Sequence, residues 1–101
     1  MSKIFLILAL LTTPIAYSNE LDFNRMKCGQ YLQMIEKLSS ENKMSVASGV
    51  LMWLYGYASG QSGVGVFGNS KFRKFATSLG AECKMNKDRP LLVMVKSIGI
   101  Q

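Results

Sequence analysis

The chain has 101 residues, of which 49% are hydrophobic, and its twelve basic and six acidic side chains give a formal charge of +6 at pH 7. This length leaves room for one domain, and the charge suits an anionic partner such as nucleic acid, anionic lipid, wall polymer or an acidic protein, unless it serves only solubility. Because the chain has two cysteines and no histidine, a typical four-ligand zinc site is excluded.

The first eighteen residues have the pattern of a secretory signal peptide. Lys3 gives a positively charged start, residues 4–11 form an apolar run, and Ala16 and Ser18 place small side chains at the two positions that a signal peptidase reads. We therefore expect residues 1–18 to be cleaved and residues 19–101 to form one exported domain with a charge of about +5. Export argues against nucleic acid as the partner.

Two cysteines, Cys28 and Cys83, lie near opposite ends of this domain. An even pair of cysteines in an exported chain indicates a disulfide, and a domain of roughly 83 residues buries only a small core, so a covalent cross-link is expected. We therefore predict a Cys28–Cys83 bridge. Both cysteines fall within the apolar stripes of predicted helices, so the bridge should join two helices.

The first helix of the domain is predicted to begin at Asp22 or Asn24, either of which can cap it, and to end at Leu38. Its inward stripe, about 120° wide, comprises Cys28, Tyr31, Leu32, Ile35 and Leu38. Cys28 therefore points into the predicted core. A polar turn follows, and Asn42 is expected to cap the next helix.

The segment from Met44 to Gly60 is predicted to be the central helix. Apolar residues cover more than half of its circumference, which favours a helix buried on most sides, and its remaining face has small residues that could let another helix approach closely. These small residues are Ser45, Ser48, Gly49, Gly56 and Ser59. A membrane-spanning helix is disfavoured, because the apolar run has about 15 residues where spanning needs roughly 20.

Residues 61–69 are rich in glycine, and Gly63, Gly65 and Gly68 have the spacing of a dinucleotide-binding fingerprint. That fingerprint requires a strand before the turn, whereas a helix precedes this one, so we expect no nucleotide or other cofactor. The segment is instead predicted to be a flexible connection. Its apolar side chains are candidates for a partly exposed contact surface, and they are Val64, Val66 and Phe67.

Two further helices complete an all-α domain of four helices. The first is predicted over Lys71 to Lys84 with Ser70 as its cap, and it turns Phe72, Phe75, Ala76, Leu79 and Cys83 inward and Arg73 and Lys74 outward. The second is predicted over Leu91 to Ile98, where Pro90 suits the first turn and Gly99 ends the helix. No segment sustains the alternation that a strand requires.

Three groups of residues together resemble the HdeA/HdeB-like family of small periplasmic proteins. They are Cys28-x-x-Tyr31-Leu32, the cluster Trp53-Leu54-x-Gly56-Tyr57-x-Ser59-Gly60, and Cys83 shortly before Pro90 and an apolar helix. The resemblance implies an all-helical fold with one disulfide between two helices. It also implies a periplasmic acid-stress chaperone that forms a homodimer at neutral pH, opens in acid and holds unfolded clients on exposed apolar surface.

The chain departs from this family in its acidic residues and in the spacing from Cys83 to Pro90, which is longer than usual. It has six acidic side chains, Glu20, Asp22, Glu36, Glu41, Glu82 and Asp88, and no histidine that could titrate between pH 5 and 7. Protonation of all six would raise the charge of residues 19–101 from about +5 to about +11 below a pH of roughly 4. The acid trigger is therefore weak.

Two functions follow from these observations. A chaperone would expose core side chains when its helices separate, namely Met34, Met44, Met52, Trp53, Tyr55, Tyr57, Phe72 and Phe75. The alternative is a dedicated partner binder, such as a periplasmic immunity protein or envelope adaptor, which would use residues 60–69 with Lys71, Arg73 and Lys74 against an acidic surface. An enzyme is not expected, because the chain has no histidine and its acidic residues are scattered.

Overall fold

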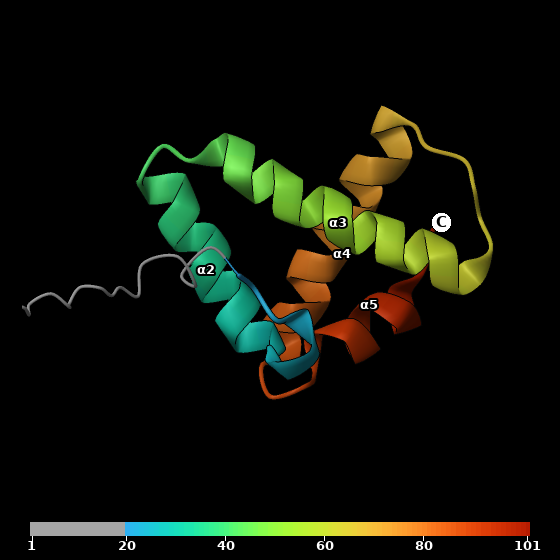
Figure 1. Cartoon of the computed structure of the whole chain (residues 1–101). Coiled ribbons are helices and arrows are strands. Elements are labelled where there is room, and N and C mark those ends of the chain that lie inside the picture. The colour runs from blue at the N-terminus through green and yellow to red at the C-terminus, as the bar shows by residue number, and fades with distance from the viewer. Residues whose placement is uncertain (1–19) are drawn as a thin grey trace, which may run out of the picture.

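The structure is a computed structural model that describes residues 20–101, so the expected signal peptide and its cleavage site lie outside the described residues. The described part folds into a 3-10 turn and four α-helices (Figure 1), in the order η2 Phe23–Arg25, α2 Cys28–Ser40, α3 Met44–Ser62, α4 Asn69–Met85 and α5 Leu91–Ile98. This confirms the predicted all-α class. None of these helices is long and apolar enough to cross a membrane.

The predicted start of the first helix is wrong, because α2 begins at Cys28 and not at Asp22 or Asn24. Asp22 instead caps the η2 turn, where its carboxylate accepts a hydrogen bond from the Asn24 N–H at 3.0 Å. The chain then runs extended and pairs with the turn before α5. Leu91 N–H donates to the Met26 carbonyl at 2.9 Å and Cys28 N–H donates to the Arg89 carbonyl at 2.9 Å. These distant partners hold residues 26 and 27 out of the helix.

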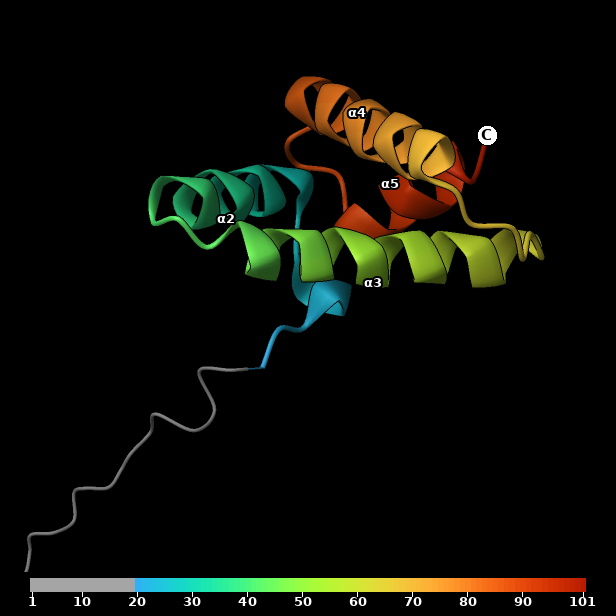
Figure 2. The same ribbon diagram turned by 90° about the horizontal axis from the view of Figure 1, so that it is seen from above.

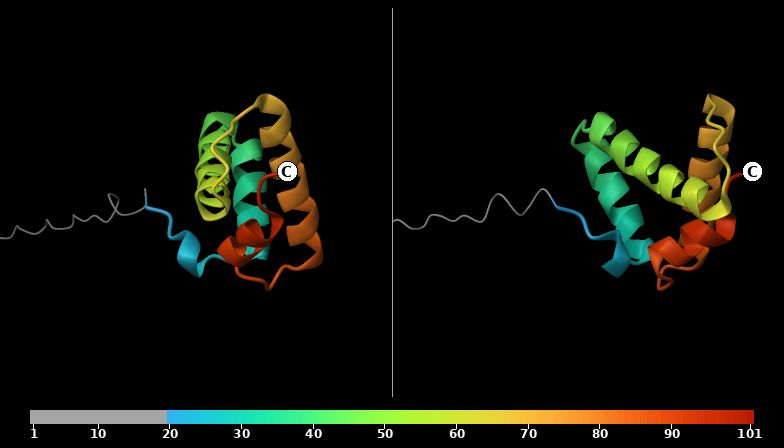
Figure 3. Two further views of the ribbon diagram at one scale, coloured as in Figure 1. Left: turned by 90° about the vertical axis from the view of Figure 1, so that its right-hand side faces the viewer. Right: turned by 45° about the vertical axis from the view of Figure 1, so that its right-hand side comes forward.

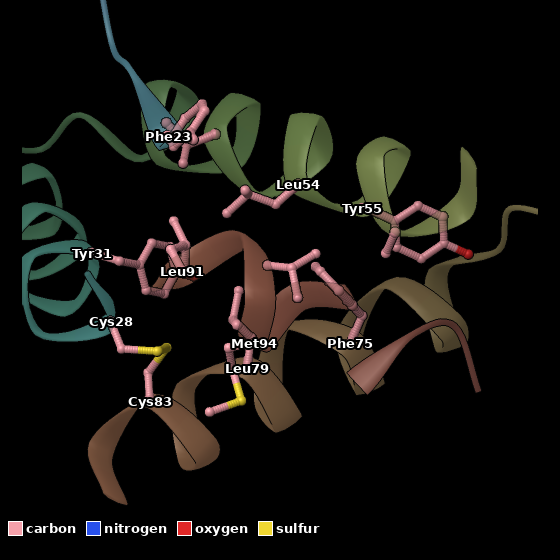
Figure 4. Close-up of a cluster of buried hydrophobic side chains, with 13 residues drawn as sticks. Phe23, Cys28, Tyr31, Leu54, Tyr55, Phe75, Leu79, Cys83, Leu91 and Met94 are labelled. Atoms are coloured by element: carbon pink, nitrogen blue, oxygen red, sulfur yellow. A yellow bond between two sulfur atoms is a disulfide. The ribbon is translucent and has the colours of Figure 1, made fainter. Parts of the chain in front are cut away.

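The disulfide is confirmed. It joins Cys28 at the start of α2 to Cys83 near the end of α4, the two Cα atoms lie 4.9 Å apart, and neither residue is exposed (Figure 4). Around it lies a single apolar cluster to which η2 and all four helices contribute. Its members in the described residues are Phe23, Cys28, Tyr31, Val50, Leu54, Tyr55, Ala58, Phe75, Leu79, Cys83, Leu91, Met94 and Val95.

The prediction that the central helix is buried on most sides is wrong. Helices α2, α4 and α5 all lie on one side of α3, and only the η2 turn approaches its other side (Figure 2). The buried residues of α3 are therefore confined to one stripe, which comprises Ala47, Val50, Leu54, Tyr55 and Ala58. Met44, Met52 and Trp53, which the sequence places in the core, are about half exposed, with relative exposures of 57%, 46% and 51%.

The ends of the helices differ from the predicted ones by a few residues. Asn42 does not cap α3, since it lies in the turn with φ of 59°, and Lys43 occupies the cap position without a side-chain bond. α3 continues past Gly60 to Ser62 and ends where Gly63 adopts a φ of 73°, a conformation that favours glycine. α4 begins at Asn69, with Gly68 and not Ser70 at the cap. The last helix has the predicted bounds.

Candidate functional site

The exposed side of α3 is an uncharged surface of apolar and small side chains. No acidic or basic residue occurs between Met44 and Ser62, and exposed residues lie along one side of this helix. We call this surface the outward face of α3 and define it as Ser45, Val46, Gly49, Met52, Trp53, Gly56 and Gly60, of which only Ser45 has a polar side chain. Isolated exposed apolar side chains are ordinary on proteins, but a contiguous uncharged face indicates contact with another molecule.

Trp53 on this face is held in place by two aromatic neighbours. Its ring lies 4.7 Å from the ring of Phe23, and the ring of Tyr57 stacks on it at 5.9 Å, nearly parallel. Phe23 itself is buried beneath α3, so the η2 turn fastens the chain against the edge of the outward face. Because these contacts order the indole while half of it stays exposed, Trp53 is a preformed apolar contact point.

The glycines of the outward face lie in open space. A β-carbon added at Gly49, Gly56 or Gly60 would meet no atom within 4 Å beyond its own helix. The close helix approach that the small residues predict therefore does not occur within residues 20–101. The backbone of α3 is left accessible on this side, where a second helix could come closer than larger side chains would permit.

The connection between α3 and α4, which the sequence predicts to be flexible, is hydrogen-bonded to the last turns of α3. We call residues 63–68 the glycine loop (Figure 3, right). The Tyr55 hydroxyl donates a hydrogen bond to the Val66 carbonyl at 3.0 Å, and the Ser59 hydroxyl donates to the Val64 carbonyl. The Val64 N–H in turn donates to the Ser59 carbonyl at 3.1 Å. The last turns of α3 therefore hold the loop in one conformation.

Tyr55 also anchors the loop through its ring. This ring is 3% exposed, and the rings of Phe67, Phe72 and Phe75 pack edgewise against it at 5.3, 5.9 and 5.5 Å. The family-like motif of α3 treats position 55 as variable, so sequence reasoning missed this residue as the organiser of the loop. The signal that could have found it is a buried tyrosine one turn before Ser59, since a buried hydroxyl needs a hydrogen-bond partner.

The residues predicted to bind a partner come together at one end of the molecule. Val66 and Phe67 are 60% and 51% exposed, whereas Val64 is half-buried. The cations Lys71, Arg73 and Lys74 follow in the first two turns of α4, and we call them the basic cluster. The Lys71 ammonium donates to the main-chain oxygen of Gln101 at 3.2 Å, while Arg73 and Lys74 are exposed.

The remaining residues of the family-like motifs lie away from the glycine loop and the basic cluster. Tyr31 is buried beside Leu91, close to the disulfide (Figure 4), and Leu32 packs at the edge of the same core. These two residues therefore belong to the core around the bridge and not to the glycine loop. Gly56 and Gly60 lie on the outward face of α3. Tyr57 lies beside this face, where its ring stacks on Trp53. Burial raises the pKa of Tyr31 to about 12.

All six carboxylates of the chain lie on the surface. Asp22 is 3.6 Å from Arg25 and Glu41 is 3.5 Å from Lys43, and all four side chains are more than two-fifths exposed. Surface ion pairs of this kind contribute little to stability, with a typical value below about 1 kcal/mol.

Comparison with known proteins agrees with the resemblance in the motifs. A model of the HdeA/HdeB family matches residues 2–93, which is most of the chain. No curated protein and no solved structure matches it.

Proposed function

The chain belongs to the HdeA/HdeB family of periplasmic acid-stress chaperones, and from this premise we propose that it holds unfolded protein clients on the outward face of α3. We propose further that it reaches the periplasm through cleavage of residues 1–18, in keeping with the family's location. Family members are chaperones and not enzymes.

The observation that carries the proposal is the uncharged and half-exposed surface around Trp53. A client segment laid along it would cover roughly 100 Å² of the indole that is now in water, which is worth about 2.5 kcal/mol. Met52, which lies beside Trp53 in the chain, adds a flexible thioether that can adapt to different client side chains. The absence of charge along the whole helix avoids selection for clients of one sign.

We also propose that two copies cover this face at neutral pH by packing α3 against α3. The open backbone at Gly49, Gly56 and Gly60 supports a close antiparallel or crossed contact. In acid each copy would lose six negative charges as its exposed carboxylates protonate, so its net charge would rise by six and mutual repulsion would weaken the pair. Separation would free the apolar face for clients.

The proposal is tested by aggregation of an unrelated acid-labile enzyme at pH 2.5 and at pH 7, with and without the protein. We expect suppression at pH 2.5 by the wild type and at least a tenfold higher protein requirement for the Met52→Ser/Trp53→Ser variant. The matched control is Met85→Ser/Val93→Ser, which removes two exposed apolar side chains from α4 and α5. Mass measured by light scattering at both pH values reports the homodimer.

Equal suppression by the two double variants would refute the outward face of α3 as the client surface. Failure of the wild type to suppress aggregation at either pH would refute the chaperone role itself. The match to the HdeA/HdeB family gives no support to the alternative role as an immunity protein, which would place the glycine loop against an effector.

A further inference from the structure

The glycine loop has the side chains of a membrane anchor. Its six residues, Gly63-Val64-Gly65-Val66-Phe67-Gly68, include no polar side chain. Its two large exposed side chains are nevertheless those of Val66 and Phe67, with 60% and 51% of their surface in contact with water. Contacts of Phe67 with Tyr55 and Phe72 hold one edge of its ring, so the exposed apolar tip is presented in a defined position.

The polar backbone of the loop is already partly satisfied from within the protein. Tyr55 donates to the Val66 carbonyl and Ser59 to the Val64 carbonyl, and the Val64 N–H donates to the Ser59 carbonyl. Backbone groups without partners are costly to move out of water, and this cost keeps lipid-exposed loops out of the hydrocarbon region of a bilayer. The hydrogen bonds from Tyr55 and Ser59 lower that cost at the two valines.

The surroundings of the loop are positively charged. No acidic residue occurs in residues 42–81 or in residues 89–101, a region that covers α3, the glycine loop, most of α4 and all of α5. The basic cluster Lys71, Arg73 and Lys74 begins three residues after the loop. The nearest acidic residue along α4 is Glu82, at its far end. An approaching anionic surface therefore meets attraction from the basic cluster at this end of the molecule.

From these three observations we propose that the glycine loop and the basic cluster dock the protein on an anionic lipid bilayer. Val66 and Phe67 enter the headgroup region, while Arg73, Lys74 and Lys71 contact lipid phosphates. A bilayer fits better than an acidic protein, because the loop offers no side-chain hydrogen-bonding group that could read a specific partner. The outward face of α3 takes no part, so docking is independent of client binding.

The test measures binding of the protein, recovered from its producing cells and with its N-terminus established by mass spectrometry, to vesicles of phosphatidylglycerol or phosphatidylcholine. We expect binding to the anionic vesicles only, with loss in high salt. Removal of two cations by Arg73→Gln/Lys74→Gln should weaken binding about 25-fold, from roughly fivefold per cation. Val66→Ser should weaken it about tenfold, because the exposed apolar area is lost.

Two controls separate the loop from general charge and general hydrophobicity. Lys37→Gln/Lys84→Gln removes the same charge from α2 and from the far end of α4, and Val93→Ser removes another exposed apolar side chain, so both should bind nearly as wild type. In a Trp53→Phe background, Phe67→Trp should show a blue-shifted emission when anionic vesicles are added. This fluorescence readout reports insertion of the loop directly.

Absence of binding to phosphatidylglycerol vesicles would overturn the proposal. So would equal loss in the two charge variants, or an unshifted emission from Phe67→Trp. Binding to polyglutamate without binding to vesicles would indicate an acidic protein as the partner instead. Because Val66→Ser leaves the outward face of α3 intact, it should suppress client aggregation as wild type does, so docking and the chaperone role can fail separately.

Discussion

Replacement of Tyr55 by phenylalanine should release the glycine loop while leaving the core in place. The substitution removes the hydroxyl that donates to the Val66 carbonyl at 3.0 Å. It keeps the ring that packs against Phe67, Phe72 and Phe75. The loop would then depend on its two hydrogen bonds with Ser59 and on the packing of Phe67 for its position.

The expected cost is about 1 kcal/mol, which is the net contribution of one neutral hydrogen bond. It should not be larger, because Val66 is largely exposed and its freed carbonyl can bind water. Tyr55→Ala, in contrast, also removes a buried ring and should cost about 3 to 5 kcal/mol. The difference between the two substitutions separates the hydroxyl from the packing of the ring.

Urea denaturation followed through Trp53, the single tryptophan, measures the free energy of unfolding. Hydrogen exchange at the Val64 amide, which donates to the Ser59 carbonyl, measures opening of the loop, and we expect this exchange to be faster in Tyr55→Phe while exchange in α2 and α5 is unchanged. The matched control is Tyr57→Phe, which deletes a hydroxyl from a tyrosine whose ring stacks on Trp53. Unchanged loop exchange in Tyr55→Phe, or equal acceleration in Tyr57→Phe, would refute the role of the Tyr55 hydroxyl.

Three further predictions concern stability. Reduction of the Cys28–Cys83 bridge, which spans 55 residues, should lower the free energy of unfolding by about 4 kcal/mol, and a loss below about 1 kcal/mol in urea denaturation would contradict this. Burial raises the pKa of Tyr31 to about 12, above an ordinary value near 10. The free energy of unfolding should therefore be unaffected by this group below pH 10 and should fall by up to about 3 kcal/mol as the pH rises to 12. Tyr31→Phe should reduce that fall in urea denaturation at alkaline pH. Gly63→Ala, at φ of 73°, should lower the free energy of unfolding by about 1 kcal/mol and lower the thermal midpoint accordingly. Gly65→Ala, which has no such φ, should change the thermal midpoint by less than about one or two degrees. Equal shifts of the thermal midpoint in the two variants would contradict the strain at position 63.

The helices of this protein could be predicted wherever apolar residues recur on one side only. Cys28 and Cys83 each sit in such a stripe, and the structure buries both and joins them. The last helix has the predicted bounds, Leu91 to Ile98, because a proline before it and Gly99 after it are local signals. The sequence also predicts partial exposure of Val64, Val66 and Phe67 in the connection after α3, and the structure exposes Val66 and Phe67 while half-burying Val64.

Other features depend on contacts between distant residues. The start of α2 at Cys28 requires hydrogen bonds to residues 87–91, and the order of the glycine loop requires the Tyr55 hydroxyl eleven residues away. No local pattern records either contact. The exposed side of α3 could not be predicted locally either, because apolar residues surround most of this helix and no charged residue marks its outer side.

The sequence alone therefore determined the helical class, the bridge and the inward sides of α2, α4 and α5, because amphipathic spacing carries that information along each helix. Only the tertiary structure decided which side of α3 faces water and that Trp53 lies there. A helix that is apolar nearly all round can bury any of its sides, and the choice is made by where its neighbours α2, α4 and α5 are able to pack.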